Sequence, residues 1–268
     1  MCIRDRHYFY RDKNDLGELL AAAAVGCGRV IEQHEIADAI ANSQSCAWRP
    51  GNGYRLARRI RRWPARNTEQ IEAITSAHDA PGLVDIWEMS PRRLDTDDSQ
   101  AEEVIDALFP KDALLCCAQL KERPKTRPRE EWRGRMSKLQ HIVPSPMSAL
   151  EGRRKSDGKL SARTEANTGP RRFLVCDFDH GTTDDHAAII LHLATRAPLA
   201  LVVYSGNKSL HGWFYCDGQS EERVRQFMSL AVTLGADPAL WLRSQFVRLP
   251  DGIREGGNRQ TVYFLTRR

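Results

Sequence analysis

The strongest constraint on the fold is a short strand pattern that ends in two acidic residues. Residues 172–176 read Arg-Phe-Leu-Val-Cys, an apolar run typical of a buried strand, and Asp177-Phe178-Asp179 comes directly after it. Because side chains alternate between the faces of a strand, Asp177 and Asp179 are predicted to point the same way. Two adjacent carboxylates repel each other, and a divalent cation such as Mg²⁺ or Mn²⁺ removes that repulsion. The alternative is a strand that simply runs into a polar turn.

The residues after Asp179 predict alternating helices and strands. Thr182 and Asp185 have the spacing of a capping box, so a helix is predicted to begin there and to end near Pro198. The further predicted elements are strands at 199–204 and 210–216, a helix from Ser220 to near Gly235, and strands at 245–249 and 261–265. This β-α-β-β-α-β order is that of the split βαβ unit, an α+β arrangement also described as ferredoxin-like or RRM-like. In such a sheet the strand with the Asp pair can be a neighbour of the strand that carries His211.

Three segments of this region resemble the motifs of a known enzyme family. They are Asp177-Phe178-Asp179, the hairpin Ser-Gly-x-Lys-Ser-Leu-His at 205–211, and Phe-Val-Arg-Leu-Pro at 246–250. They look like the three motifs of the archaeo-eukaryotic primase superfamily, and most of all like the primase-polymerase domains of bacterial mobile elements and phages. The resemblance covers about the last hundred residues, and the hairpin is its most distinctive part.

The resemblance implies a primase or primase-polymerase, which is a nucleotidyltransferase that copies a DNA template during replication of a mobile element or phage. It implies a two-metal mechanism with Mg²⁺ or Mn²⁺, in which one ion activates the primer hydroxyl and the other stabilises the leaving pyrophosphate. By this resemblance Asp177, Asp179 and His211 are the predicted catalytic residues, and the two aspartates bind metal. The predicted nucleotide-binding residues are Ser205, Lys208, Ser209, His211 and Arg248.

The third metal-binding carboxylate is less well defined by the sequence. The resemblance requires one more acid, but none lies within residues 246–249. Asp237 has the best spacing and is the predicted third metal ligand. Asp251 and Asp217 remain alternatives.

A cluster of arginines precedes this region. Between Tyr54 and Arg66 there are six arginines, although the net charge of the whole chain is only +5. On a helix four of them would share one face, and clustered cations favour phosphate contacts. The predicted nucleic-acid-binding residues are Arg55, Arg58, Arg59 and Arg62. A solvated helix face is the alternative. The expected partners are a single-stranded DNA template and nucleoside triphosphates, and the resemblance allows a helicase domain or protein as a further partner.

Composition and periodicity divide the chain into four parts. Residues 1–6 are interpreted as a tail read from a sequencing adapter. Residues 7–118 are predicted to be mainly helical, with helices between 15 and 43, at 68–78 and at 100–108, and a strand at 114–119. Residues 119–170, rich in Pro, Arg, Lys, Ser and Gly, are expected to form an extended, largely irregular connector. Residues 171–268 are the primase-like module, whose C-terminal end is compatible with truncation.

Several function classes are disfavoured by the sequence. It contains no apolar run long enough to span a bilayer, so no membrane partner is expected. Its seven cysteines form no C-x₂-C pair, which disfavours a zinc ribbon or a disulfide framework and favours the cytoplasm. No P-loop is present. Two rival functions remain: a non-catalytic replication initiator or DNA-binding protein, and a metal-dependent phosphohydrolase with Asp177 as nucleophile.

Overall fold

The structure is a computed structural model that describes residues 34, 37, 63–94 and 99–266. The described residues 63–94 and 99–266 belong to one compact unit, which contains two four-stranded sheets and the helices packed against them. Of the predicted helices between residues 15 and 43, only His34 and Ala37 are described, both as helical. The predicted basic helix with Arg55, Arg58, Arg59 and Arg62 lies outside the described residues.

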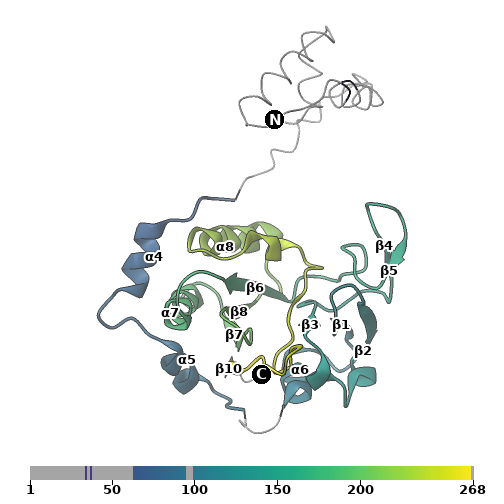
Figure 1. Ribbon diagram of the computed structural model, residues 1–268, viewed down its shortest axis with the longest axis horizontal. Helices are drawn as coiled ribbons and strands as arrows, with labels where there is room; N and C mark the ends of the chain where they lie inside the picture. The colour runs from purple at the N-terminus through teal and green to yellow at the C-terminus, as the bar shows by residue number, and fades with distance from the viewer. Residues whose placement is uncertain (1–33, 35–36, 38–62, 95–98, 267–268) are drawn as a thin grey trace. The chain divides into compact units, whose positions relative to one another are not determined.

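A four-stranded antiparallel sheet forms the centre of the unit (Figure 1). Its strands, in spatial order, are β10 (Val262–Leu265), β7 (Leu199–Tyr204), β8 (Leu210–Tyr215) and β6 (Phe173–Phe178). Strand β8 pairs with both β6 and β7, so β6 and β7 run parallel on either side of it. The strands and helices predicted between residues 172 and 235 are therefore present. The predicted neighbourhood of the Asp177 strand and the His211 strand is confirmed.

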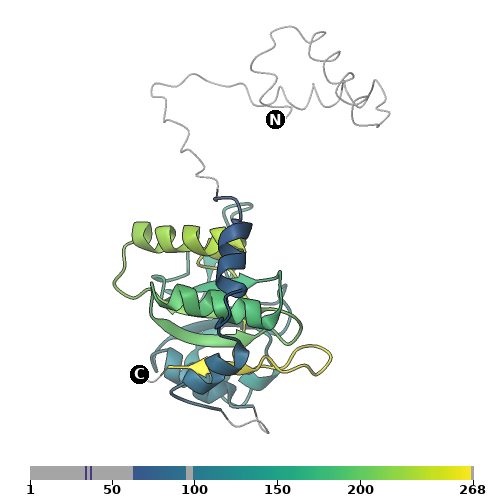
Figure 2. The same ribbon diagram turned by 90° about the vertical axis from the view of Figure 1, so that its left-hand side faces the viewer.

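Helices cover one face of this sheet. They are α4 (Thr68–Thr75), α5 (Leu83–Met89), α7 (Thr183–Ala194) and α8 (Glu221–Thr233). Figure 2 looks onto this helical layer. Helix α7 begins at the predicted capping box, because the Thr182 hydroxyl accepts from the Asp185 amide and the Asp185 carboxylate accepts from the Thr182 amide. Leu174, Cys176 and Phe178 of β6 point into this layer, where they pack with the apolar sides of α7 and α8.

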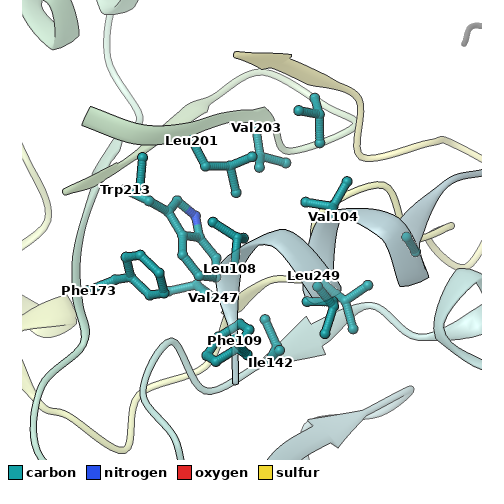
Figure 3. Close-up of a cluster of buried hydrophobic side chains, with 14 of the residues drawn as sticks. Val104, Leu108, Phe109, Ile142, Phe173, Leu201, Val203, Trp213, Val247 and Leu249 are labelled. Atoms are coloured by element: carbon teal, nitrogen blue, oxygen red, sulfur yellow. The ribbon is translucent and has the colours of Figure 1, made fainter. Parts of the chain in front are cut away.

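The opposite face of the sheet packs against a second layer. This layer holds helix α6 (Ala101–Leu108) and a second four-stranded antiparallel sheet. The strands of that sheet, in spatial order, are β2 (Lys125–Pro128), β1 (Leu114–Ala118), β3 (His141–Ile142) and β9 (Val247–Arg248). Figure 3 shows the core between the layers, where Phe173 and Trp213 meet Leu108 and Val247. The alternation along β6 thus divides its side chains between two cores.

Residues 119–170 hold several short elements between largely irregular stretches. They contain β2, two single-turn 3₁₀ helices at Arg129–Trp132 and Met136–Lys138, β3, and the short hairpin of β4 (Gly152–Arg153) and β5 (Leu160–Ser161). Trp132, Met136 and Ile142 are buried in the core between the layers. A few well-spaced apolar residues thus anchor a segment whose average composition is polar.

The strand after α8 also departs from expectation. The β-α-β-β-α-β order placed it in the sheet with β6, but β9 pairs with β3 in the second sheet, and β10 completes the first. The fold is therefore a mixed helix and strand structure built on antiparallel sheets. None of the helices in the described part of the chain is long and apolar enough to cross a membrane.

Candidate active site

A polar cavity of about 360 Å³ lies where the two sheets meet. Strands β6 and β8 line it from one sheet, and β3 and β9 line it from the other. It brings together every predicted catalytic, metal-binding and nucleotide-binding side chain: Asp177, Asp179, Ser205, Lys208, Ser209, His211, Asp237 and Arg248. Asp177 and His211 reach it because they share their strand faces with Val175 and Trp213, which pack in the core between the layers.

Asp177 and His211 form the centre of the cavity. They are directly opposite each other on β6 and β8, and His211 Nε2 lies 3.3 Å from Asp177 Oδ1. Both side chains are largely buried. The contact is close but not a well-directed hydrogen bond, so Oδ1 has no directed donor. Burial raises the pKa of the Asp177 carboxyl, but attraction to His211 and polar contacts with His211 and Ser209 outweigh it, so the pKa lies below its ordinary value.

Asp179 lies at the more open side of the cavity. Its carboxylate is about half exposed, and Lys208 Nζ lies 3.6 Å from Oδ1. The same ammonium donates to the backbone carbonyl of Asp179 at 3.3 Å. Lys208 therefore connects the hairpin between β7 and β8 to the end of β6. An exposed pair of this kind contributes little to stability and separates readily when another anion or cation competes for it.

The hairpin at 205–209 is held tightly although it carries polar side chains. Ser205 and Ser209 are buried; the Ser205 amide donates to the Ser209 carbonyl at 2.8 Å, and the Ser209 amide donates to the Ser205 hydroxyl at 3.1 Å. Gly206 takes a left-handed φ of 74°, and a Cβ there would lie 3.0 Å from the Arg259 carbonyl. These contacts hold Ser209 and Lys208 at the mouth of the cavity.

The second sheet contributes the predicted residue Arg248 and, beside it, His141, which the sequence did not single out. Arg248 Nη1 lies 3.2 Å from His141 Nε2, and the two residues are a cross-strand pair between β9 and β3. Burial and the nearby charges of Arg248 and Lys121 lower the pKa of His141 to about 4, so its ring is neutral at pH 7. Burial and the charge of Arg254 lower the pKa of Arg248, whereas Asp177 acts in the opposite direction. Lys121 and Arg254 also line the cavity.

Only one of the three candidates for a third carboxylate lines the cavity. The Asp237 amide donates to the Asp177 carbonyl at 3.0 Å, which brings Asp237 beside the end of β6. Its Oδ1 accepts from the Ala239 amide, because Asp237 caps a 3₁₀ turn. Asp251 is buried elsewhere in an ion pair with Arg259, and Asp217 pairs with Arg172 at the protein surface.

The acidic residues fit a divalent cation as oxygen donors, but they do not form a closed cage. Asp177 offers a buried Oδ1 without a directed donor, and Asp179, just past the end of β6, offers a half-exposed carboxylate. Among the described residues, no three His, Cys, Asp or Glu side chains are grouped closely enough to hold an ion by themselves. Mg²⁺ is commonly held by one or two carboxylates together with substrate phosphates, which is the arrangement that two acids beside several cations can accommodate.

A larger hollow of about 670 Å³ lies elsewhere, and its walls are mainly apolar side chains such as Leu83, Trp87 and Tyr263. Its charged residues, Asp251 and Arg259, are already bonded to each other. The polar cavity is therefore the better candidate for chemistry, because its charged groups converge on open space.

Comparison of the chain with protein-family models, with curated proteins and with solved structures gives no match. Function is therefore inferred from the residues of the cavity.

Proposed function

We propose that this protein is a DNA-templated nucleotidyltransferase, a primase or primase-polymerase, that uses Mg²⁺ or Mn²⁺. The observation that supports the proposal is that acidic and basic side chains face each other across one cavity. Two aspartates and a histidine lie on β6 and β8, and basic side chains face them from the hairpin and from β9. Phosphoryl transfer needs carboxylates that bind a metal ion and cationic side chains that bind the phosphates. The reaction depends mainly on positioning and electrostatics.

The basic residues would hold the triphosphate. Lys208 is on a rigid hairpin and about 60% exposed, so its ammonium can turn from Asp179 towards an incoming phosphate. Arg248 is directed by its contact with His141, and its planar guanidinium can donate to two phosphate oxygens at once. Arg254 Nη1 is already held by the Ser205 carbonyl at 3.2 Å, which positions a further cation beside the hairpin.

Asp177 and Asp179 would act on the hydroxyl group that attacks the nucleotide. Asp177 stays ionised at neutral pH because its pKa lies below its ordinary value. A divalent cation bound by Asp177 and Asp179 would lower the pKa of the attacking hydroxyl and neutralise phosphate charge. His211 is positioned by its cross-strand partner to donate from a ring nitrogen to a phosphate oxygen. Ser209 lies beside it on the same hairpin.

The connection of β6, α7, β7 and β8 supports an RRM-like interpretation of the catalytic module. In this connection β6 and β7 are parallel and β8 lies between them, which is the arrangement of a split βαβ unit. Asp177 and His211 lie on the sheet face away from the crossover helix α7.

Incorporation of labelled nucleotides on a single-stranded DNA template, with Mg²⁺ or Mn²⁺, tests the proposal. We expect the full chain to extend or initiate a strand, and Asp177→Asn to reduce the rate by about 100-fold or more, the scale of single electrostatic groups in catalysis. Binding of the template, measured by fluorescence anisotropy, should stay unchanged in this variant. Asp217→Asn removes an equivalent charge outside the cavity and serves as the matched control.

Two results would redirect the interpretation. Template binding without incorporation by the wild-type chain would favour a non-catalytic initiator or DNA-binding protein. Release of phosphate with an acid-stable aspartyl adduct at Asp177 would favour a phosphohydrolase. Within the proposed function, Asp237→Asn tests whether Asp237 is the third metal ligand. If this variant loses as much of the incorporation rate as Asp177→Asn does, Asp237 belongs to the metal site.

A further inference from the structure

A second cavity of about 530 Å³ lies beside the loops that lead from β1 to β2 and from the second 3₁₀ turn to β3. Five basic side chains line it and no acidic one does: Arg123, Lys125, Arg127, Arg135 and Lys138. Its floor is apolar, formed by residues such as Ala118, Leu120 and Leu139. We refer to it as the basic groove.

These cations lack acidic partners in the part of the chain that the structure describes. None of the five forms an ion pair with a described residue, whereas Arg129 and Arg133 of the same segment pair with Asp106 and Glu130. Lys125 and Arg127 lie on the same face of β2, where their cross-strand partners on β1 are Cys117 and Leu115. Like charges held together repel each other, so a cluster of this kind is stabilised by an anionic ligand.

Two loops contribute lining residues to both the basic groove and the polar cavity. Leu120 and Arg123 line the basic groove, and Lys121 between them lines the polar cavity. In the same way Lys138 lines the basic groove and His141, three residues on, lines the polar cavity. A strand bound in the groove would therefore lie next to the loops that carry Lys121 and His141 of the polar cavity.

We propose that the basic groove binds the single-stranded DNA template and guides it to the polar cavity. This inference rests on the proposed function and names the template-binding surface of the same site. Proteins that bind single strands combine a row of cations for the phosphates with a floor on which the bases lie. Arg127 is half-buried with its guanidinium 5.4 Å from the centre of the Trp132 ring, so it offers a fixed flat surface at the floor. A base can stack on such a guanidinium plane.

Titration of a labelled single-stranded DNA oligonucleotide by the full chain, followed by fluorescence anisotropy at several salt concentrations, tests the inference. The test variant is Arg123→Gln, Lys125→Gln, Lys138→Gln, three exposed positions of the basic groove. The control variant is Lys111→Gln, Lys155→Gln, Lys159→Gln, which removes the same charge from exposed positions that line neither cavity. Arg127 is kept because its contact with Trp132 makes it part of the packing.

For the test variant we expect Kd to rise about 10-fold or more at about 100 mM salt. A plot of the logarithm of the association constant against the logarithm of the salt concentration should become less steep, by about 2 in slope. Each phosphate contact to a single strand contributes about 0.7 to that slope. The control variant should bind like the wild-type chain. An unchanged Kd and slope in the test variant, or an equal loss in the control, would overturn the assignment. Tighter binding of a duplex than of the single strand would also overturn it.

The outcomes separate this inference from the proposed function. If the wild-type chain incorporates nucleotides and the test variant binds template normally, the groove is wrong and the catalytic proposal stands. If the test variant loses binding and the wild-type chain incorporates nothing, the groove stands as a DNA-binding surface and the catalytic proposal fails.

Discussion

Arg248 and His141 face each other across β9 and β3, with Arg248 Nη1 3.2 Å from His141 Nε2. An arginine has no acceptor, so Nε2 of His141 must accept, and the imidazole is neutral. Protonation of His141 would set two positive groups against each other in a largely buried site. The geometry of the second wall of the cavity therefore depends on an uncharged histidine.

Acid should weaken the fold through His141. Its pKa is about 4 in the folded chain against an ordinary 6.5, so below pH 6.5 the unfolded state binds more protons than the folded state. The stability contribution is complete above pH 6.5 and is lost as the pH falls towards 4, to a total of about 3 kcal/mol. Urea unfolding across this range, in the wild-type chain and in His141→Gln, measures it. The variant should show a flatter pH dependence; equal curves for wild type and His141→Gln would contradict the assignment.

Asp251 should be important for stability rather than for catalysis. Its buried carboxylate accepts from Arg259 at 2.7 and 2.8 Å and from the Gln100 amide at 2.5 Å, and its φ is 59°. We expect Asp251→Ala to lower the free energy of unfolding by about 3 kcal/mol, because it removes a buried carboxylate that accepts from both Arg259 and the Gln100 amide. Asp251→Asn should cost less, since Asn tolerates a left-handed φ. Denaturant titration checks this, with Asp217→Ala, at an exposed pair, expected to cost under about 1 kcal/mol. A larger loss in the Asp217 variant would refute the ranking.

These residues show what sequence reasoning could and could not find. The strand at 173–178, the capped helix and the hairpin were predictable, because each is encoded by local periodicity and by side chains such as Thr182 that satisfy backbone groups next to them. The approach of Asp177 to His211 followed from strand alternation. Their roles in catalysis remain a proposal.

The second wall of the cavity is formed by β3 and β9. Apart from Arg248 it was not predictable, because it depends on pairing between distant segments. His141 lies in a segment of polar composition and becomes part of the cavity only through its pairing with Arg248. The burial of Trp132 and Met136 likewise depends on a surface formed by β6 and β8. Asp251 was an alternative candidate for the metal ligand, and no local sequence pattern reveals that it forms an ion pair with Arg259.

The buried cysteines should be unreactive in the folded chain. Cys116, Cys117, Cys176 and Cys216 are free thiols in the described core. Burial raises the pKa of Cys116 and of Cys216 to about 11, and it raises those of Cys117 and Cys176 as well. Since the thiolate is the nucleophile, we expect iodoacetamide to leave these four unmodified at about pH 8 and to modify all of them in urea, as read by peptide mass mapping. Rapid native labelling of Cys176 would contradict the packing of β6 against α7.

Binding of a nucleotide should stabilise the folded chain through the basic wall. With Mn²⁺ and a non-hydrolysable nucleoside triphosphate at about 100 times Kd, binding adds about 2.7 kcal/mol, a rise in Tm of roughly 5–10 °C. Arg248→Gln and Lys208→Gln should each lose much of that rise. Arg196→Gln, at an exposed position outside the polar cavity, is the matched control. An undiminished rise in both cavity variants would remove these residues from the nucleotide site.

The pairing of β3 with β9 joins residues 107 positions apart, and the chain between them builds the whole of β6, α7, β7, β8 and α8. The chain thus leaves one layer, completes most of the other, and then returns to finish the first. Such non-local pairing is slow to form. A proteolytic cut between residues 142 and 247 would put β3 and β9, the two strands of the second wall of the cavity, on different fragments.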